Sequence, residues 1–464
     1  MDLSWRNATA PINRLPPEVL ALLPDFWDTY KREQNIIVLT HVCRAWRQVF
    51  TSRSSLWADL DCKDADKTRL YLERSRSSPI NLSLRRGDNL PPDDPFFQIT
   101  PHAIGRLKSL LVEGTLENLQ DITTSLSCPA PLLEDMSISG GSEFGPGDIP
   151  DLTPALFDGD FSSLHTLYLE CVRTELPWRN MVTLRFLGLI KTSPVPMGQL
   201  LDFLESAPHL QKVNLRFEIL TSGAAEDGRL VSLTHLRFMS IMGGSSSVLL
   251  DHLLIPVGAY LTVTVDLPEP PIKHPRFLDN LRNLPNFTVI NLIGGVCPQM
   301  RFSGPNGMVT MQLTNETAPD RGTCLVLRLL AQFDTSKTEW LGIDFSGDPS
   351  CYPPHRTLLP MKNLRTLELY RCENPDIFPF IHALDPSKSP SGIVVCPGLE
   401  SLSISSRSTF IKDFIGMAAA RKARGVTLDS VKICSWGWKT GYTRSDMLEL
   451  EKHVSHVRWG LGQW

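Results

Sequence analysis

No stretch of the chain stays apolar for the roughly 18 residues that a membrane-spanning helix needs. The first residues, MDLSWRNATAPINRLPPEV, also lack the apolar core of a signal peptide. The ten cysteines are scattered and no two of them form a CxxC pair, so their spacing encodes neither a zinc site nor a redox pair. These absences predict an intracellular protein, cytoplasmic or nuclear, that has free thiols and no membrane partner.

A strong charge of either sign is missing as well. The 46 basic and 50 acidic side chains give a net charge of −4, which offers no reason to expect nucleic acid as a partner. The glycine-rich GxGxxG and GxxxxGK[ST] motifs that cradle nucleotide phosphates are absent, as are HExxH and GxSxG. We therefore expect no enzyme, with no catalytic residue, no metal ligand and no cofactor. The alternative, an enzyme with an unrecognised site, would require a deep pocket with converging polar groups.

The segment 12–57 carries three short motifs in a fixed order. It opens with LPPE at 15–18, has THVCRAWR at 40–47 in its centre, and closes with SLW at 55–57. In this order the motifs resemble the F-box, a short helical module that docks a protein onto the Skp adaptor of SCF-type ubiquitin ligases. The connector after the first motif is a few residues longer than in compact F-boxes. A weaker resemblance through 59–84 is to the expanded F-box family of mushroom-forming fungi.

The residues themselves predict two helices in this segment. The first should start at the two prolines of LPPE, since proline suits the first turn of a helix, and Pro24 should end or kink it. The second should begin near Glu33 or Asn35 and run on without a break. One apolar stripe at helical spacing marks it: Ile36, Leu39, Val42, Cys43, Trp46, Val49 and Phe50. Helices this short cannot bury all of their apolar surface alone. The remainder must meet a partner or, alternatively, cap the downstream part of the chain.

The resemblance also implies which side chains would clamp the Skp adaptor. They are Leu15, Pro16, Val19, Leu20, Val42, Trp46, Leu56 and Trp57. The apolar stripe of the second helix independently favours Val42 and Trp46. Through the adaptor the chain would reach a cullin, and an unidentified target protein would bind elsewhere.

From about residue 107 onward, a pattern of the form apolar-x-x-apolar-x-apolar recurs at intervals of roughly 20 to 35 residues. Its instances begin at Leu107, Leu133, Leu164, Leu184, Leu210, Leu233, Tyr260, Phe287, Met308, Trp340, Leu364, Leu399 and Leu428. Such a pattern is typical of leucine-rich repeats, whose period is about 20–29 residues. A proline often stands two residues before the first apolar position, where it would stop a preceding helix. Helical stretches at 198–207 and 411–424 precede two of the expected strands. The alternative is a generic α/β domain in which the spacing arises by chance.

These patterns predict an α/β fold in which a small N-terminal helical F-box is followed by an irregular leucine-rich-repeat solenoid, an arc of strand–turn–helix units. The expected divisions are listed in chain order: a tail at 1–11, the F-box at 12–60, a linker with the first solenoid elements at 61–100, the solenoid at 101–445, and a capping helix at 446–464. Trp436, Trp438 and Trp464 are expected to pack near this cap, the alternative being an aromatic ligand site. The arginine-rich segment 67–86 is interpreted as a solvated face or, alternatively, as a surface for an acidic or phosphorylated partner.

The function that these expectations favour is that of a substrate-receptor subunit of an SCF-type ubiquitin ligase. The F-box would dock the Skp adaptor and the repeats would hold the target protein. The alternative is an interaction scaffold that carries an F-box but does not recruit the ligase.

Overall fold

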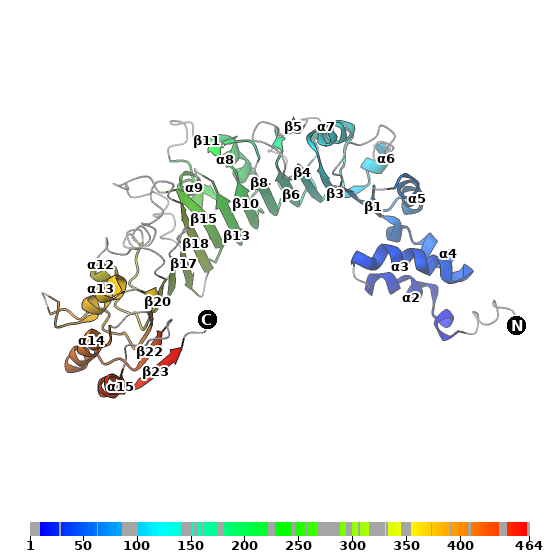
Figure 1. The fold of residues 1–464 in the computed structure, drawn as a ribbon. Helices are drawn as coiled ribbons and strands as arrows, with labels where there is room; N and C mark the ends of the chain where they lie inside the picture. Colours follow the sequence, from blue (N-terminus) through cyan, green and yellow to red (C-terminus); the bar gives the residue numbers. More distant parts are fainter. Residues whose placement is uncertain are drawn as a thin grey trace. The chain divides into compact units, whose positions relative to one another are not determined.

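The structure is a computed structural model of the whole chain. It describes residues 10–26, 29–62, 64–85, 101–140, 151–152, 156–159, 161–174, 181–190, 192–220, 228–243, 246–256, 258–266, 288–293, 299–304, 307–314, 330, 333–344, 354–372, 374–389, 392–406, 410–435 and 443–461. The chain forms two compact units, Met1–Ser193 and Pro194–Trp464. Each contains helices and a mostly parallel sheet, so the fold is α/β with a group of short helices at the N-terminus (Figure 1). None of the described helices is long and apolar enough to cross a membrane.

The first unit begins with short helices. They are η1 Pro11–Arg14, α2 Pro17–Ala21, η2 Leu23–Phe26, α3 Thr29–Val42, α4 Arg44–Ser52 and η3 Ser54–Trp57. Three further helices, α5 Ala65–Ser75, α6 Pro101–Ile104 and α7 Leu116–Ser125, lie between strands. A single turn, η5 Leu156–Gly159, comes later.

The sheet of the first unit is wholly parallel, and its strands follow one another in chain order. They are β1 Asp59–Asp61, β2 Ile80–Arg85, β3 Leu107–Gly114, β4 Asp135–Gly140, β6 Thr166–Glu170 and β8 Phe186–Ile190. A separate pair joins β5 Asp151–Leu152 to β7 Arg173–Thr174. The register places Leu110, Met136, Leu167 and Leu187 in one row across the sheet, and all four are buried. Side chains two residues apart share a face of a strand, so a second buried row runs beside the first.

The sheet of the second unit contains eleven strands in the described part of the chain. In spatial order they are β10 Lys212–Arg216, β13 Phe238–Met242, β15 Tyr260–Asp266, β18 Gly307–Thr314, β17 Gln299–Gly304, β16 Val289–Ile293, β19 Trp340–Asp344, β20 Thr366–Cys372, β21 Ser401–Ser406, β22 Ser430–Ser435 and β23 His456–Leu461. Only β17 runs antiparallel to its neighbours, because it forms a hairpin with β18. Two short pairs join β9 Val195–Pro196 to β11 Ile219–Leu220 and β12 Val231–Ser232 to β14 Leu253–Leu254.

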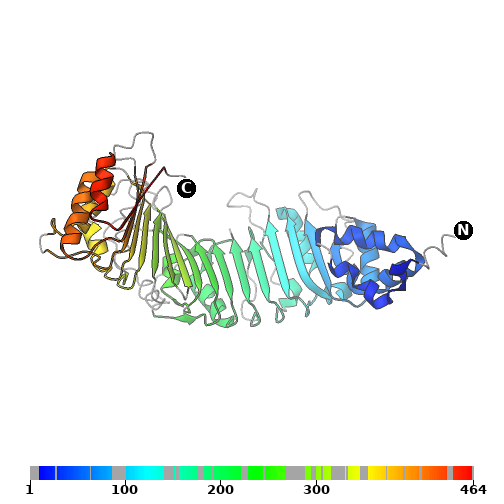
Figure 2. The ribbon, with the colours of Figure 1, turned by 90° about the horizontal axis from the view of Figure 1, so that it is seen from below.

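The helices of the second unit are α8 Met197–Ser206, α9 Ser246–Leu250, α12 Pro354–Leu358, α13 Asn374–Leu384, α14 Ile411–Ala423 and α15 Arg444–Glu451. The last four pack one against the next in chain order (Figure 2). The helices that the sequence predicts at 198–207 and 411–424 are confirmed as α8 and α14.

Most of the predicted strands are confirmed. In the eight instances beginning at Leu107, Leu133, Leu164, Leu184, Leu210, Leu364, Leu399 and Leu428, the second and third apolar residues lie on a strand and are buried. The instance at Phe287 is confirmed for Ile290 and Leu292, which are buried on β16, while Phe287 itself lies outside the described residues.

Four predicted registers are wrong. The instance at Leu233 lies three residues early, since Met239 and Ile241 are the buried residues of β13 and Phe238 is 39% exposed. The instances at Tyr260, Met308 and Trp340 lie two residues late. In each of these three, an apolar side chain on the opposite face of the strand imitates the first position of the pattern. The buried pairs are Leu261 with Val263, Val309 with Met311, and Leu341 with Ile343.

A recurring turn precedes these strands and explains the prolines. The backbone N–H of the first leucine bonds to the carbonyl three residues before it, as Leu133 does to Ala130 and Leu210 does to Ala207. Pro131 and Pro208 are therefore the second residues of β-turns, a position that the fixed φ of proline favours. Leu236 bonds to Leu233 in the same way at 3.0 Å, so Leu233 opens a turn and does not begin the strand pattern.

The predicted helix over 446–464 is wrong in its second half. The helix α15 ends at Glu451, and residues 456–461 form β23, which pairs in parallel with β22. Val457 and Trp459 thus alternate on a strand beside Val431 and Ile433. The tryptophans at 436, 438 and 464 lie outside the described residues.

Candidate functional site

The helix that the sequence predicts as continuous through THVCRAWR is in fact two helices. Cys43 separates α3 from α4 with an extended backbone, φ −159° and ψ 173°. The side chain of Arg47 bridges the break, because its Nε donates a hydrogen bond of 2.9 Å to the carbonyl oxygen of Thr40. Val42 and Trp46 therefore lie on different helices and do not share a stripe.

Four of the eight predicted docking residues lie in the core of the N-terminal helices. Leu20 is 4% exposed, Trp46 5%, Leu56 2% and Trp57 1%. The indole N–H of Trp57 donates to the carbonyl of Phe50 at 2.9 Å. These side chains hold the helices together, and a direct contact of theirs with a partner stays a prediction.

The indole of Trp57 also ties the N-terminal helices to α5. The guanidinium of Arg74 lies 4.3 Å from the indole ring centre, close enough for a cation–π interaction. The ring of Tyr71 meets the same indole edge-on at 5.0 Å between centres. The N-terminal helices and the start of the sheet thus share one packed core within the first unit.

The other four predicted docking residues are on the surface. Leu15 is 39% exposed, Val19 44% and Val42 47%, and Pro16 is also exposed. Leu15 and Pro16 lead into α2, Val19 lies within it, and Val42 is the last residue of α3. Because η2 contacts both α2 and α3, these surface residues belong to neighbouring elements of one helical group (Figure 1).

Five more exposed apolar side chains lie on these N-terminal elements and on η1 and η2, and the sequence reasoning missed them. They are Ile12, Leu22, Phe26, Ile37 and Val38, with exposed fractions from 40% to 83%. The spacing contains a signal for part of this set: Val38 and Val42 are four residues apart, on the side of α3 away from buried Ile36 and Leu39. Leaving out Pro16, we call the eight large apolar side chains of this set the apolar face: Ile12, Leu15, Val19, Leu22, Phe26, Ile37, Val38 and Val42.

A salt bridge and a backbone contact join the end of α2 and η2 to Arg53. The guanidinium of Arg53, just before η3, lies 2.9 Å from Oδ2 of Asp25 in η2 and also donates to the carbonyl of Ala21. These contacts fix the end of α2 to the segment that leads into η3.

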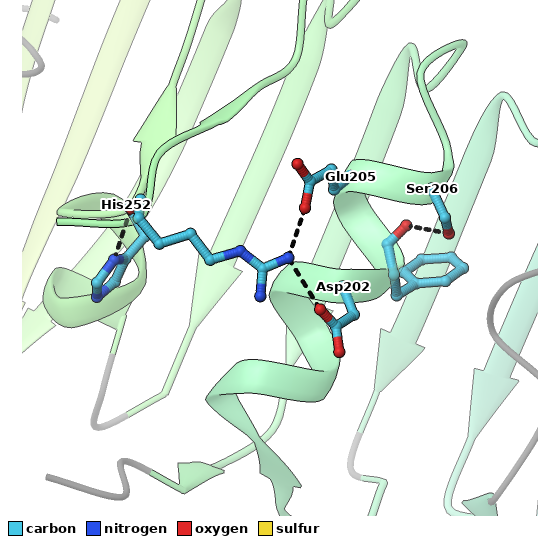
Figure 3. Close-up of polar contacts among 6 residues, drawn as sticks. Asp202, Glu205, Ser206 and His252 are labelled. Carbon is cyan, nitrogen blue, oxygen red and sulfur yellow. Dashed lines mark hydrogen bonds and ion pairs between the residues drawn. The ribbon is translucent and has the colours of Figure 1, made fainter. Parts of the chain in front are cut away.

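In the second unit, Arg229 forms a polar cluster with α8 (Figure 3). Its Nη2 lies 2.9 Å from Asp202 Oδ1 and 2.5 Å from Glu205 Oε2. The hydrogen bond to Glu205 raises the pKa of the Arg229 guanidinium despite partial burial. His252 Nδ1 lies 2.9 Å from the carbonyl oxygen of Arg229, which places the cluster between α8 and the short strands β12 and β14.

Replacing Arg229 with methionine should change the free energy of unfolding by less than about 1 kcal/mol, because its partners are more than half exposed and water screens such pairs. Urea unfolding of the two proteins would measure the difference. A loss of several kcal/mol would contradict this interpretation and would show that the cluster is a major support of the second unit.

A second polar cluster lies on β19, β20 and β22. Burial raises the pKa of the Glu368 carboxyl, and hydrogen bonding by Trp340 and the charge of Lys432 oppose this effect in part. The hydroxyl of Tyr370 also donates to Glu368 Oε2. The indole of Trp340 lies against Gly342, where an added Cβ would come within 2.4 Å of the ring. An aromatic ring and a desolvated carboxylate are thus fixed together on this sheet.

The raised pKa of Glu368 predicts a pH dependence of stability. The native state holds this proton more tightly than the unfolded chain, so its contribution is complete below the unfolded pKa and is lost as the pH rises through the folded pKa. Glu368→Gln cannot ionise and keeps an oxygen that accepts from Tyr370. Urea unfolding between pH 4 and pH 7 should therefore show a smaller loss of stability for the variant than for the wild type. Equal pH dependence of the two proteins would contradict the assignment.

Among the described residues, no group of three or more His, Cys, Asp or Glu side chains is placed to hold a metal ion. The feature that distinguishes the N-terminal helices is the apolar face. No model of a known protein family matches the chain, and no curated protein matches it either.

Proposed function

We propose that the chain is a substrate-receptor subunit of an SCF-type ubiquitin ligase, in which the N-terminal helices are an F-box that docks the Skp adaptor. The apolar face is the observation that carries this proposal. Of the twenty large apolar side chains that are exposed in the described part of the chain, eight lie between residues 12 and 42. Exposed apolar side chains concentrated in this way mark an interaction site.

The motifs and the surface agree for part of the segment. LPPE supplies Leu15 and Pro16 to the surface, and THVCRAWR supplies Val42, while Trp46, Leu56 and Trp57 are buried. An adaptor that covered the apolar face would remove this surface from water, at a gain of about 25 cal/mol per Å² of apolar area.

The rest of the chain is proposed to be an irregular leucine-rich-repeat solenoid that holds the target protein. Its recurring unit is a β-turn, a buried leucine and a short strand with two inward apolar residues, which supports this assignment. Each unit leaves an apolar face that the next unit covers, as in repeat proteins. The antiparallel β17 and the irregular spacing would be departures from a regular repeat.

In such a ligase the chain supplies proximity. Holding the target near a conjugating enzyme turns an encounter in solution into a reaction within one complex, which accelerates the transfer without chemistry from the receptor itself. The receptor therefore needs two binding surfaces and no active site.

The test is co-expression of the full chain with a Skp adaptor and a cullin, followed by size-exclusion chromatography with light scattering. A stoichiometric complex of all three supports the proposal. Binding of the adaptor without the cullin would instead favour an interaction scaffold that carries an F-box. Failure to bind the adaptor would contradict both.

A further inference from the structure

One side of the sheet in the second unit carries a group of aromatic and basic side chains. The strands β10, β13, β15, β18 and β17 are consecutive neighbours in this sheet (Figure 1). Two buried rows cross them in register: Val213, Met239, Leu261, Val309 and Phe302, then Leu215, Ile241, Val263, Met311 and Met300. Because successive side chains of a strand point to opposite faces, the residues between these rows lie on the other, outer face of the sheet.

Two rows also cross the outer face. The first is Lys212, Phe238, Tyr260, Met308 and Ser303, and the second is Asn214, Ser240, Thr262, Thr310 and Arg301. Among the described residues on the strands of this sheet, Phe238 and Tyr260 are the two large apolar side chains that are exposed, at 39% and 51%. They are direct partners on β13 and β15, so the exposed apolar surface of the sheet is gathered in one place.

The charged side chains in these rows are basic. Lys212 on β10 and Arg301 on β17 flank the two aromatic rings, and Arg216 lies four residues after Lys212 on the same face of β10. All three are exposed, and none of them belongs to a salt bridge in the described part of the chain. Neither row contains an aspartate or glutamate, and the next acidic residues along these strands, Glu218 and Asp266, lie past the end of β10 and at the end of β15. We call the following six residues the aromatic–basic patch: Lys212, Arg216, Phe238, Tyr260, Arg301 and Met308, of which Met308 is partly exposed.

The spacing of the patch fits an extended peptide that crosses the strands. Neighbouring strands lie about 4.8 Å apart, so the backbones at Lys212 and Arg301 are about 19 Å apart across the sheet. An extended peptide rises about 3.3 Å per residue, so about six residues cover this distance. An apolar side chain near the centre of such a peptide would lie on Phe238 and Tyr260, and acidic side chains towards its two ends would reach the basic residues.

We propose that the aromatic–basic patch binds an extended acidic segment of the target protein, with an aromatic or large apolar residue near the centre of that segment. The inference rests on the proposed role of this part of the chain in holding a target, and it names the chemistry of the segment that is held. Aromatic side chains bury a large area on contact, and the flanking cations favour an acidic partner over a basic one. The partly exposed hydroxyl groups of Thr262 and Thr310 lie in the second row, where they can bond to the main chain of the segment.

A single-stranded nucleic acid also combines negative charge with flat rings, but the patch suits it less well. Nucleic acids are held through phosphate contacts repeated along the strand, and the patch has three basic side chains on a chain of net charge −4. The observations therefore favour a short acidic peptide.

The experiment uses the full chain without an adaptor and measures the fluorescence polarisation of labelled peptides at low salt. The probe is Glu-Glu-Ser-Phe-Ser-Glu-Glu. One control peptide replaces every glutamate with glutamine, which removes the charge, and a second replaces the phenylalanine with alanine, which removes the ring. Each control should bind at least about tenfold more weakly than the probe. Added salt should weaken the binding of the probe.

A pair of charge variants tests the location of the site. Lys212→Gln with Arg301→Gln should lower the affinity for the probe at least about tenfold. Its matched control is Arg356→Gln with Lys362→Gln, which makes the same change in net charge at two exposed positions on α12 and after it. The control should bind the probe like the wild type.

A pair of apolar variants tests the rings. Phe238→Ala with Tyr260→Ala should also lower the affinity at least about tenfold. Leu359→Ala with Ile393→Ala removes two other large apolar side chains, which are 41% and 48% exposed, and should leave the affinity unchanged. Circular dichroism would verify that each variant is folded.

Equal affinity for the glutamate and glutamine peptides would overturn the proposal, as would equal losses in a variant and its matched control, or no binding of the probe at about 1 mM. Tighter binding of a single-stranded DNA of about ten nucleotides than of the probe would overturn it in favour of nucleic acid. A dimer of the free chain that Phe238→Ala with Tyr260→Ala dissociates, seen by light scattering, would overturn it in favour of a second copy of the chain. Because no adaptor is present, failure of this experiment would leave the adaptor-docking proposal intact, and failure of adaptor docking would leave the peptide result unchanged.

Discussion

Replacing Arg421 with alanine is expected to destabilise the second unit by about 3–5 kcal/mol, because buried carbonyl groups lose their donor and the removed side chain leaves a cavity. Arg421 lies on α14 and has no exposed surface. Its guanidinium donates hydrogen bonds to three backbone carbonyls, at 2.9 Å to Val395, 2.9 Å to Cys396 and 3.4 Å to Leu384. No carboxylate among the described residues pairs with it. The arginine therefore serves as a buried donor that satisfies the carbonyls of two neighbouring segments.

The physical reason for the large effect is that alanine would remove the donors and leave the acceptors in place. Buried carbonyls without partners cost about 1–3 kcal/mol each where water cannot reach them, and the lost volume adds a cavity. Burial lowers the pKa of the Arg421 guanidinium and raises that of the Cys396 thiol to about 12, so the nearby thiol stays neutral and supplies no counter-charge.

Hydrogen exchange of the full chain would measure this effect locally. Amides of α13 and α14 should exchange faster in Arg421→Ala than in the wild type, together with those near Val395. Arg421→Met keeps the apolar stem and should recover the packing part of the loss only. If the alanine variant lost less than about 1 kcal/mol of the free energy of unfolding, the carbonyl groups would have found other hydrogen-bond donors.

The sequence does not distinguish Arg421 from its neighbours. It lies in the run RKAR at the end of a correctly predicted helix, where basic side chains are common because they favour the C-terminal end of the helix dipole. Lys422, next to it, is exposed and bonds to the carbonyl of Lys452. Only the packing of α14 against the preceding turn decides which basic residue is buried.

The strands were predictable wherever inward residues alone matched the pattern. Leu164, Leu167 and Leu169 form such a case, since each is fully buried. The register failed at Tyr260 and Trp340, where an apolar residue on the outer face imitated a core position. When both faces of a strand carry apolar residues, two registers fit the apolar pattern equally well, and the sequence does not decide between them.

In the N-terminal segment, periodicity predicted helix but missed the break at Cys43. Apolar residues continue at helical spacing across it, so nothing in the pattern marks the extended backbone there. On either side of this break, Val42 lies at the surface and Trp46 lies in the core. The resemblance to the F-box selected both residues for one role, while their burial differs.

The difference in exposure between Val42 and Trp46 decides which variants can test whether the apolar face docks the Skp adaptor. Trp46→Glu would bury a charge at a position that is 5% exposed and would disrupt the helices, so loss of binding in that variant would say nothing about contact. Val19 and Val42 are 44% and 47% exposed, and glutamate at either position can remain in water in the free chain.

The double variant Val19→Glu with Val42→Glu should therefore stay folded and lose affinity for the Skp adaptor by about 100-fold or more. Two charges introduced into an apolar contact would each lose their hydration on binding, and central interface positions typically cost about 2 kcal/mol or more when disrupted. Surface plasmon resonance with immobilised adaptor would measure the affinity, and the melting temperature would verify the fold.

The matched control is Val182→Glu with Val248→Glu. These valines are 51% and 37% exposed and lie outside the N-terminal helices, so the variant carries the same chemical change and the same net charge. It should bind the adaptor like the wild type. If both double variants lost affinity equally, added negative charge and not the apolar face would govern docking. If the Val19 and Val42 variant bound normally, the eight-residue face would not be the adaptor contact, because two glutamates on α2 and α3 cannot both lie harmlessly within an apolar interface.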